Sequence, residues 1–234
     1  MKQVSGRILT AAMKQLLKML FFITVLTVLL FATSGRPDWL MGWIYAGIYA
    51  CGLVVTTALM LPRSPELLAE RINIHAGSKK WDRLLAPLMA TAGPGLTIVT
   101  AGLDMRFGWS PHVALPVKAG ASAFAVLAYG LLAWSMVTNR FFSAVVRIQT
   151  DRGHTVISSG PYRIVRHPGY TAMTACLLCT PLMLGSLWAF VPALATLIIS
   201  LVRTLLEDRT LQMELAGYRD YTRRVPYLLV PGIW

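Results

Sequence analysis

Residues 170–206 read YTAMTACLLCTPLMLGSLWAFVPALATLIISLVRTLL, an apolar run with a single charged residue, Arg203. The run is too long for one helix across a bilayer, which needs about 20 residues. Gly185 and Ser186 lie in its middle and predict a turn. The expected structure is a helical hairpin with arms near Tyr170–Leu184 and Leu187–Leu206.

Four shorter apolar stretches precede this run, and each approaches the length of one crossing. They are Leu16–Phe31, Trp39–Leu61, Leu84–Leu103 and Leu115–Val137. The chain is 56% hydrophobic and 14% charged, whereas about a quarter of the residues in an ordinary soluble domain are charged. These features predict an all-α, polytopic membrane protein. We expect four transmembrane helices, then a C-terminal transmembrane hairpin and an amphipathic tail.

Two details qualify this outline. Ala32-Thr33-Ser34 resembles a signal-peptide cleavage site, but the preceding apolar run exceeds a usual signal core, so we expect a retained first helix. Gly93-Pro94-Gly95 interrupts the third stretch and predicts a kink there.

The net charge of +12 is distributed very unevenly. If the N-terminus is cytoplasmic, 19 of the 22 basic residues lie on the cytoplasmic side, and only Arg36, Arg106 and Lys118 lie on the other. Such asymmetry is the positive-inside pattern and predicts an even number of crossings with both termini cytoplasmic. The charge therefore indicates topology and contact with membrane lipids, and no nucleic-acid partner is expected.

The composition of the chain changes at about residue 139, from mainly apolar to richer in polar groups. Residues 1–138 are expected to form transmembrane helices that serve as a scaffold and give access to an acceptor. Residues 139–234 are richer in polar groups and are expected to form a cofactor-binding catalytic region. Cys176 and Cys179 have the spacing of a metal or redox pair, but they lie in an apolar segment and read as small packing residues. No metal site is predicted.

Three kinds of group gather around the hairpin: cations for an anion, carboxylates for an amine or ribose hydroxyls, and aromatic faces for a base or a sulfonium. They are Arg166 and His167, Glu207 and Asp208, and Tyr162 and Tyr170. Because S-adenosylmethionine carries an anion, a cation and an aromatic base, it fits this set. Each group also has a plainer interpretation, as a headgroup anchor, an uninvolved loop residue or a solvated helix end.

Five spaced elements occur in order over residues 139–234. They are Gly160-Pro-Tyr-Arg-x-x-Arg-His-Pro-x-Tyr170, Pro181-Leu-x-Leu-Gly-Ser-x-Trp188, Arg203-x-x-x-Glu207-Asp208-x-x-Leu211, Gly217-Tyr-x-x-Tyr221 and Val225-Pro-Tyr-x-Leu-x-Pro231. This combination resembles the isoprenylcysteine carboxyl methyltransferase family. The wider superfamily includes phospholipid and thiol methyltransferases and membrane sterol reductases.

The resemblance implies a membrane-embedded S-adenosylmethionine-dependent methyltransferase. The cofactor positions it implies are Gly160, Tyr162, Arg166, His167, Pro168, Tyr170, Glu207 and Asp208. Arg203 matches the position that meets the acceptor, and together with Glu207 it forms the expected catalytic pair. The acidic pair departs from the family pattern, which is usually Glu-Glu, so the shorter Asp208 is the weaker of the two expected contacts.

A carboxylate acceptor would need only alignment with the methyl sulfonium, with Arg203 orienting it, whereas a thiol or amine would need a base such as Glu207. The sequence leaves the acceptor open among a lipophilic small molecule, a lipid and a prenylated substrate, and it carries no signal for an oligomeric state. Two other functions compete with methyl transfer. One is a membrane reductase of the sterol-reductase type that uses NADPH. The other is a non-enzymatic membrane module such as a transporter, although no inverted repeat is visible.

Overall fold

The computed structural model describes residues 2–63 and 77–234, which form helices and connections with no β-strand among them. In chain order the helices are α1 (Lys2–Ser34), α2 (Leu40–Arg63), α4 (Asp82–Pro87), η1 (Leu88–Ala92), α5 (Gly93–Phe107), α6 (Leu115–Thr138), η2 (Thr150–Arg152), η3 (Gly160–Arg163), α7 (Pro168–Leu184), α8 (Phe190–Glu214) and α9 (Tyr218–Arg224). The fold is therefore all-α over the described residues, as predicted.

Among the described residues, five segments are long and apolar enough to cross a membrane. They are Leu16–Ser34, Leu40–Pro62, Asp82–Phe107, Leu115–Thr138 and Phe190–Glu214. The chain is thus a multi-pass integral membrane protein. The predicted hairpin is formed by α7 and α8, but α7 has only 17 residues, or about 25 Å of helix, which is shorter than a hydrocarbon core of about 30 Å.

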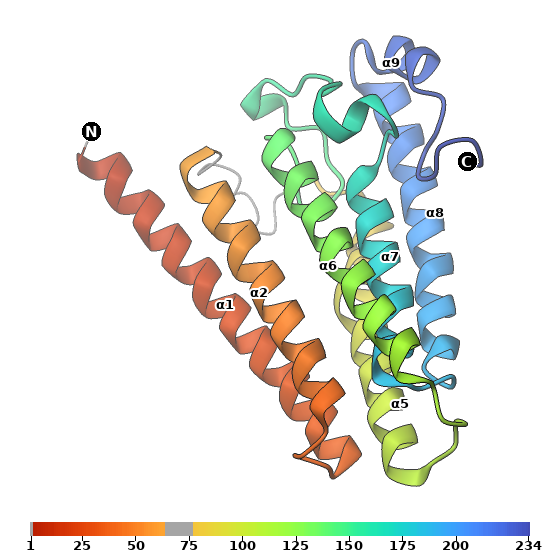
Figure 1. Ribbon diagram of the computed structural model, residues 1–234. Coiled ribbons are helices and arrows are strands. Elements are labelled where there is room, and N and C mark those ends of the chain that lie inside the picture. Colours follow the sequence, from red (N-terminus) through yellow and green to blue (C-terminus); the bar gives the residue numbers. More distant parts are fainter. Residues whose placement is uncertain (1, 64–76) are drawn as a thin grey trace.

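The helices form a bundle in which α1 and α2 lie side by side at one edge and α6, α7 and α8 lie at the other (Figure 1). Both ends of the chain, together with α9, lie at the same end of this bundle. The largest core cluster draws on α1, α2, α5, α6 and α7 and on the ends of their connections. Its buried members are Leu26, Leu30, Trp39, Tyr45, Ile98, Ala101, Ala121, Ala125, Cys179, Met183, Leu184 and Ala189.

The third apolar stretch is irregular next to the place where a kink was expected. The segment Asp82–Phe107 contains a π-helical turn, η1, directly before Gly93. A Cβ atom on Gly93 would collide with the side chain of Thr196, so the glycine lets α5 approach α8 closely. Wide turns of this kind occur frequently at functional sites, and Met89 and Ala90 of this turn line two cavities.

The end of the bundle opposite the termini is held by a buried carboxylate. Asp104 of α5 is 3% exposed and accepts hydrogen bonds from the Ser110 amide, at 2.7 Å, and from the hydroxyls of Ser110 and Ser186. Ser186 lies in the turn between α7 and α8. This network fixes the hairpin turn to α5 and so sets where the two arms meet the polar region at the other end.

Candidate active site

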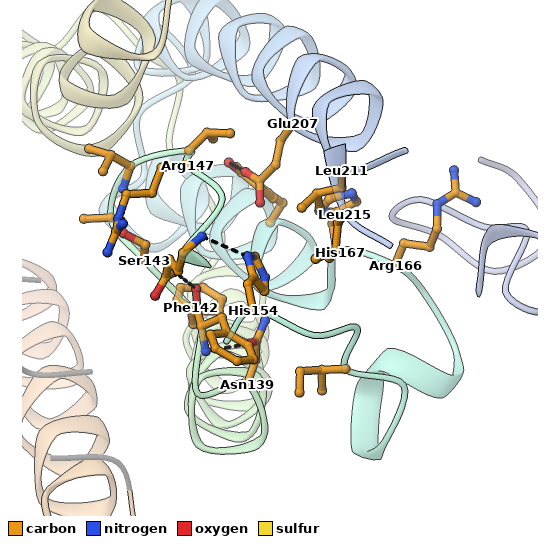
Figure 2. A pocket seen from close by; sticks show the side chains of 18 of the residues that line it. Asn139, Phe142, Ser143, Arg147, His154, Arg166, His167, Glu207, Leu211 and Leu215 are labelled. Atoms are coloured by element: carbon orange, nitrogen blue, oxygen red, sulfur yellow. Dashed lines mark hydrogen bonds between the residues drawn. The ribbon is translucent and has the colours of Figure 1, made fainter. Parts of the chain in front are cut away.

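The polar region lies at the end of the bundle that carries both chain ends, and it surrounds a cavity of about 170 Å³. Its walls come from the end of α4 and from η1, from residues 139–157, and from parts of η3, α7, α8 and α9. Figure 2 shows Glu207 extending from α8 toward the segment that carries Phe142, Arg147 and His154. Five of the eight predicted cofactor positions line this cavity: Tyr162, Arg166, His167, Tyr170 and Glu207.

Asp208 lies outside the lining and serves as the centre of a buried network. Its Oδ1 atom accepts hydrogen bonds from Arg166 Nε at 2.9 Å and from the Tyr218 hydroxyl at 2.9 Å, and lies 3.1 Å from His167 Nε2. Its Oδ2 atom accepts from Arg166 Nη2 at 3.3 Å and from Gln212 Nε2 at 2.6 Å. Both oxygens are therefore occupied by protein groups, and at 4% exposure Asp208 organises the site rather than facing its cavity.

Arg166 also holds the C-terminal tail across the site. Its Nη1 atom donates to the carbonyls of Val225 and Pro226 at 2.9 and 2.7 Å. The Arg166 amide donates to Tyr227 O, and the His167 amide donates to Leu228 O. Residues 225–229, which we call the tail strap, are thus bound to the loop that carries the Arg-His-Pro motif.

Glu207 and Arg203 approach the cavity from successive turns of α8. The Tyr170 hydroxyl donates to Glu207 Oε2 at 2.6 Å. Arg203 donates from Nε and Nη2 to the two oxygens of Asp82, at 2.6 and 3.2 Å, and its guanidinium lies 5.4 Å from the centre of the Tyr170 ring. Within the described part of the chain, Glu207 Oε1 and Arg203 Nη1 form no hydrogen bond, so these two atoms remain for a ligand.

Asp82 is a site residue that the sequence reasoning missed. It is fully buried and binds Arg203 together with the Val146 amide, which donates to Asp82 Oδ2 at 2.6 Å. Arg203 Nη2 adds a hydrogen bond to Ala144 O at 3.1 Å. The ion pair therefore fastens the cavity wall around residues 144–146 to α4 and α8. The available signal was a carboxylate placed between Lys80 and Arg83, directly before the third apolar stretch.

His154 was also missed, because it lies in none of the spaced sequence motifs. Its Nδ1 atom accepts a hydrogen bond from the Gln149 amide at 3.3 Å (Figure 2), and its ring lies 4.5 Å from that of Phe141. Burial, together with the nearby charges of Arg147 and Arg152, lowers the pKa of His154 to about 4. The imidazole is therefore neutral near pH 7.

The other motif residues shape the backbone around the cavity. Gly160 has a φ of +55°, and a Cβ atom there would lie 3.0 Å from Thr138 Oγ1. Pro168 begins α7 and is buried. Neither residue lines the cavity. Tyr162 does: its hydroxyl accepts from Asn139 Nδ2 at 3.2 Å, its carbonyl accepts from the Tyr221 hydroxyl at 2.7 Å, and burial raises its pKa.

The tail helix α9 contributes aromatic side chains to the site. In α9, Tyr218 and Tyr221 are buried and line the cavity, while Arg219 and Arg223 are exposed. The helix therefore presents its aromatic face to the site.

A bundle of helices long and apolar enough to span a membrane, with a polar cavity at the end that carries both chain ends, defines a membrane protein with an internal site. Residues 121–213 match the isoprenylcysteine carboxyl methyltransferase (ICMT) family. The match supports the family resemblance found in the motifs and suggests a membrane methyltransferase. No curated protein matches the chain.

The donor set in the cavity fits S-adenosylmethionine. Glu207 supplies a carboxylate with one oxygen available for a cation, and Arg203 supplies a guanidinium with one nitrogen available for an anion. The rings of Tyr162, Tyr218 and Tyr221 supply aromatic faces. Among residues 2–63 and 77–234, no group of three His, Cys, Asp or Glu side chains lies close enough together to hold a metal ion.

Proposed function

We propose that the protein is an S-adenosylmethionine-dependent methyltransferase that methylates a lipophilic acceptor at the membrane, in the manner of an ICMT. The observation that carries the proposal is the pair of unused polar atoms, Glu207 Oε1 and Arg203 Nη1, in a cavity with tyrosine walls. The cofactor, when bound, supplies an electrophilic methyl group on a sulfonium. We place it against Tyr162, His167, Tyr170 and Glu207.

In this proposal Arg166 lines the cofactor site, while Asp208, Gly160 and Pro168 support the lining residues from outside the cavity. Arg203 orients the acceptor through Nη1 while Asp82 fixes its other two nitrogens. A carboxylate acceptor is already nucleophilic at neutral pH, so alignment supplies most of the rate. For a thiol or amine acceptor, Glu207 would take the proton, since its Oε1 atom lies at the cavity.

Calorimetric titration of the detergent-solubilised protein with S-adenosylmethionine and, separately, with NADPH tests the proposal. We expect binding of S-adenosylmethionine alone. Glu207→Gln should weaken this binding about ten- to a hundredfold, because losing a charged contact costs on the order of 1.5–3 kcal/mol. Glu214→Gln is the matched control, since Glu214 lies on the same helix but is exposed and pairs with Lys79.

Binding of NADPH instead would indicate the reductase alternative. Binding of neither compound would overturn the assignment of the cavity. Equal affinity for S-adenosylmethionine in wild type and Glu207→Gln would remove Glu207 from the site.

A further inference from the structure

The segment that follows α9 turns back along the bundle and runs beside α8 (Figure 1). Contacts of the tail strap fix its level along the helices. The His167 amide donates to Leu228 O, and the Thr171 hydroxyl donates to Leu229 O at 2.8 Å. The His167 ring in turn lies 3.1 Å from Asp208 of α8. Residues 228 and 229 therefore lie level with the first turn of α7 and with the part of α8 near Asp208.

The outer side of α8 shows how far lipid reaches along this helix, which is one of the candidate membrane spans. Exposed apolar side chains recur there at helical spacing and form one strip: Val191, Leu194, Ile198, Val202 and Leu205. The next exposed side chain, Arg209, is charged. On a membrane helix such a strip faces lipid chains, so the boundary between lipid chains and headgroups lies between Leu205 and Arg209. Residues 228 and 229 lie at this boundary.

The tail changes from charged to apolar over a few residues. Arg223 and Arg224 are exposed and directly precede the tail strap. Residues 227–234 read YLLVPGIW and carry no charged side chain. A segment that passes from the headgroup region into the membrane interface has this order of residues, because basic side chains contact headgroups while aromatic and aliphatic ones enter the apolar side.

Residues 230–234, which we call the tail turn, form a closed turn with apolar side chains on its outside. The Val230 amide donates to Trp234 O at 2.9 Å, and the Trp234 amide donates to Val230 O at 3.1 Å. Ile233 is 81% exposed, and Val230 and Trp234 are 41% and 36% exposed. Adjoining exposed apolar side chains mark an interaction surface, and an indole suits the membrane interface, where its ring meets lipid and its N–H group stays near the headgroups.

We propose that the tail turn is an interfacial membrane anchor, with Val230, Ile233 and Trp234 among lipid chains just below the headgroups. The level of the turn carries the proposal, because the Leu229 amide also donates to Trp234 O, at 3.0 Å, and so ties the turn to the boundary that the strip on α8 defines. Seated there, the turn holds the tail strap against the Arg-His-Pro loop. The inference does not depend on the proposed function.

Spin labels measure the depth of the tail turn in the full chain in lipid nanodiscs. A nitroxide is attached at Ile233→Cys in a background in which the three native cysteines are replaced by alanine. Its collision rates with oxygen, which concentrates in lipid, and with a water-soluble nickel complex are then compared. Ile198→Cys is the lipid control, since Ile198 is 62% exposed on the strip of α8. Arg223→Cys is the water control, since the Arg223 side chain is 82% exposed on α9.

We expect the label at Ile233 to collide with oxygen severalfold more often than the Arg223 label does, and with the nickel complex severalfold less often, as the Ile198 label should. Accessibility equal to that of the Arg223 label would overturn the inference, because the turn would then lie in water. A label shielded from both reagents would overturn it as well, since protein and not lipid would then cover the turn.

Tryptophan quenching decides the question even if the cysteine-free variants do not fold. The fluorescence contributed by Trp234 is the difference between wild type and Trp234→Phe. In nanodiscs of phosphatidylcholine brominated near the carbonyl end of its acyl chains, we expect this contribution to be quenched, whereas aqueous iodide should leave it nearly unchanged. Quenching by iodide without quenching by the brominated lipid would overturn the anchor, and so would quenching by neither.

Discussion

At the residue scale, the site is organised by two carboxylates that do different work although they are adjacent in sequence. Asp208 is buried and bonded to Arg166, His167 and Tyr218. Glu207 keeps one oxygen available beside the cavity. Successive helical residues point about 100° apart. Asp208 therefore faces the surrounding protein groups, whereas Glu207 faces the cavity.

We therefore expect Asp208→Asn to act mainly on stability. The substitution removes the negative charge that compensates the buried Arg166 guanidinium, and breaking a buried pair costs about 3 kcal/mol or more. Thermal unfolding of the detergent-solubilised protein measures the loss. Asp220→Asn is the control, because Asp220 forms an exposed ion pair with Arg223. Such a pair is expected to contribute little to stability. An unchanged melting temperature for Asp208→Asn would contradict the role of this network.

The sequence could predict which residues gather at the site. It could not predict which of them face the cavity and which are bonded to other protein groups. The motifs grouped Arg166, His167 and Glu207 as site residues, and all three line one cavity in the structure. Protein groups bond to both Asp208 oxygens, and one of these groups, Tyr218, comes from the tail. The position of the tail depends on tertiary packing, which motif spacing does not predict. In the same way, the Asp82–Arg203 pair joins residues far apart in sequence, and the packing of α4 against α8 brings them together.

At the element scale, hydropathy predicted each long helix and located the hairpin turn. Gly185, with a φ of +71°, ends α7 after Leu184 as expected. The π-helical turn η1 was not predicted, because no amino-acid pattern is specific to such a turn. The conformation of the segment between α6 and α7 was not predicted either. It depends on individual contacts, such as the hydrogen bond from the Gln149 amide to His154 Nδ1.

His154 makes the stability of this segment depend on pH. Its pKa is about 4 in the folded protein, against 6.5 for the free side chain, so the unfolded chain binds the extra proton first. The stabilisation is complete above pH about 6.5 and is lost as the pH falls toward about 4. We expect melting temperatures of the wild type to fall over this range and those of His154→Gln to fall less. His112→Gln is the control, since His112 is exposed; identical pH profiles for wild type and His154→Gln would contradict the argument.

At the scale of the whole molecule, the positions of the chain ends agree with the distribution of charge. Both ends and the polar region lie at the same end of the bundle (Figure 1), and the positive-inside pattern assigns that end to the cytoplasm. Arg36, Arg106 and Lys118 lie near the connections at the opposite end. The cofactor cavity would then open toward the cytoplasm.

We predict that both termini face the cytoplasm. Reporter fusions before residue 1 and after Trp234, one type active only in the cytoplasm and one only outside it, measure the two positions. Cytoplasmic readouts at both ends are expected. Opposite readouts would require an odd number of crossings, with the short helix α7 failing to span the membrane.

The tail strap sets an order of events during synthesis. Residues 225–229 leave the ribosome after every long helix of the bundle, yet Arg166 and His167 bind their carbonyls. All the long helices can therefore be inserted before the loop that carries Arg166 and His167 gains its contacts with the tail strap. A chain that stops before Pro226 would keep every long helix but lose the contacts to the carbonyls of residues 226–228, so insertion of the helices and completion of the site are separate steps in its maturation.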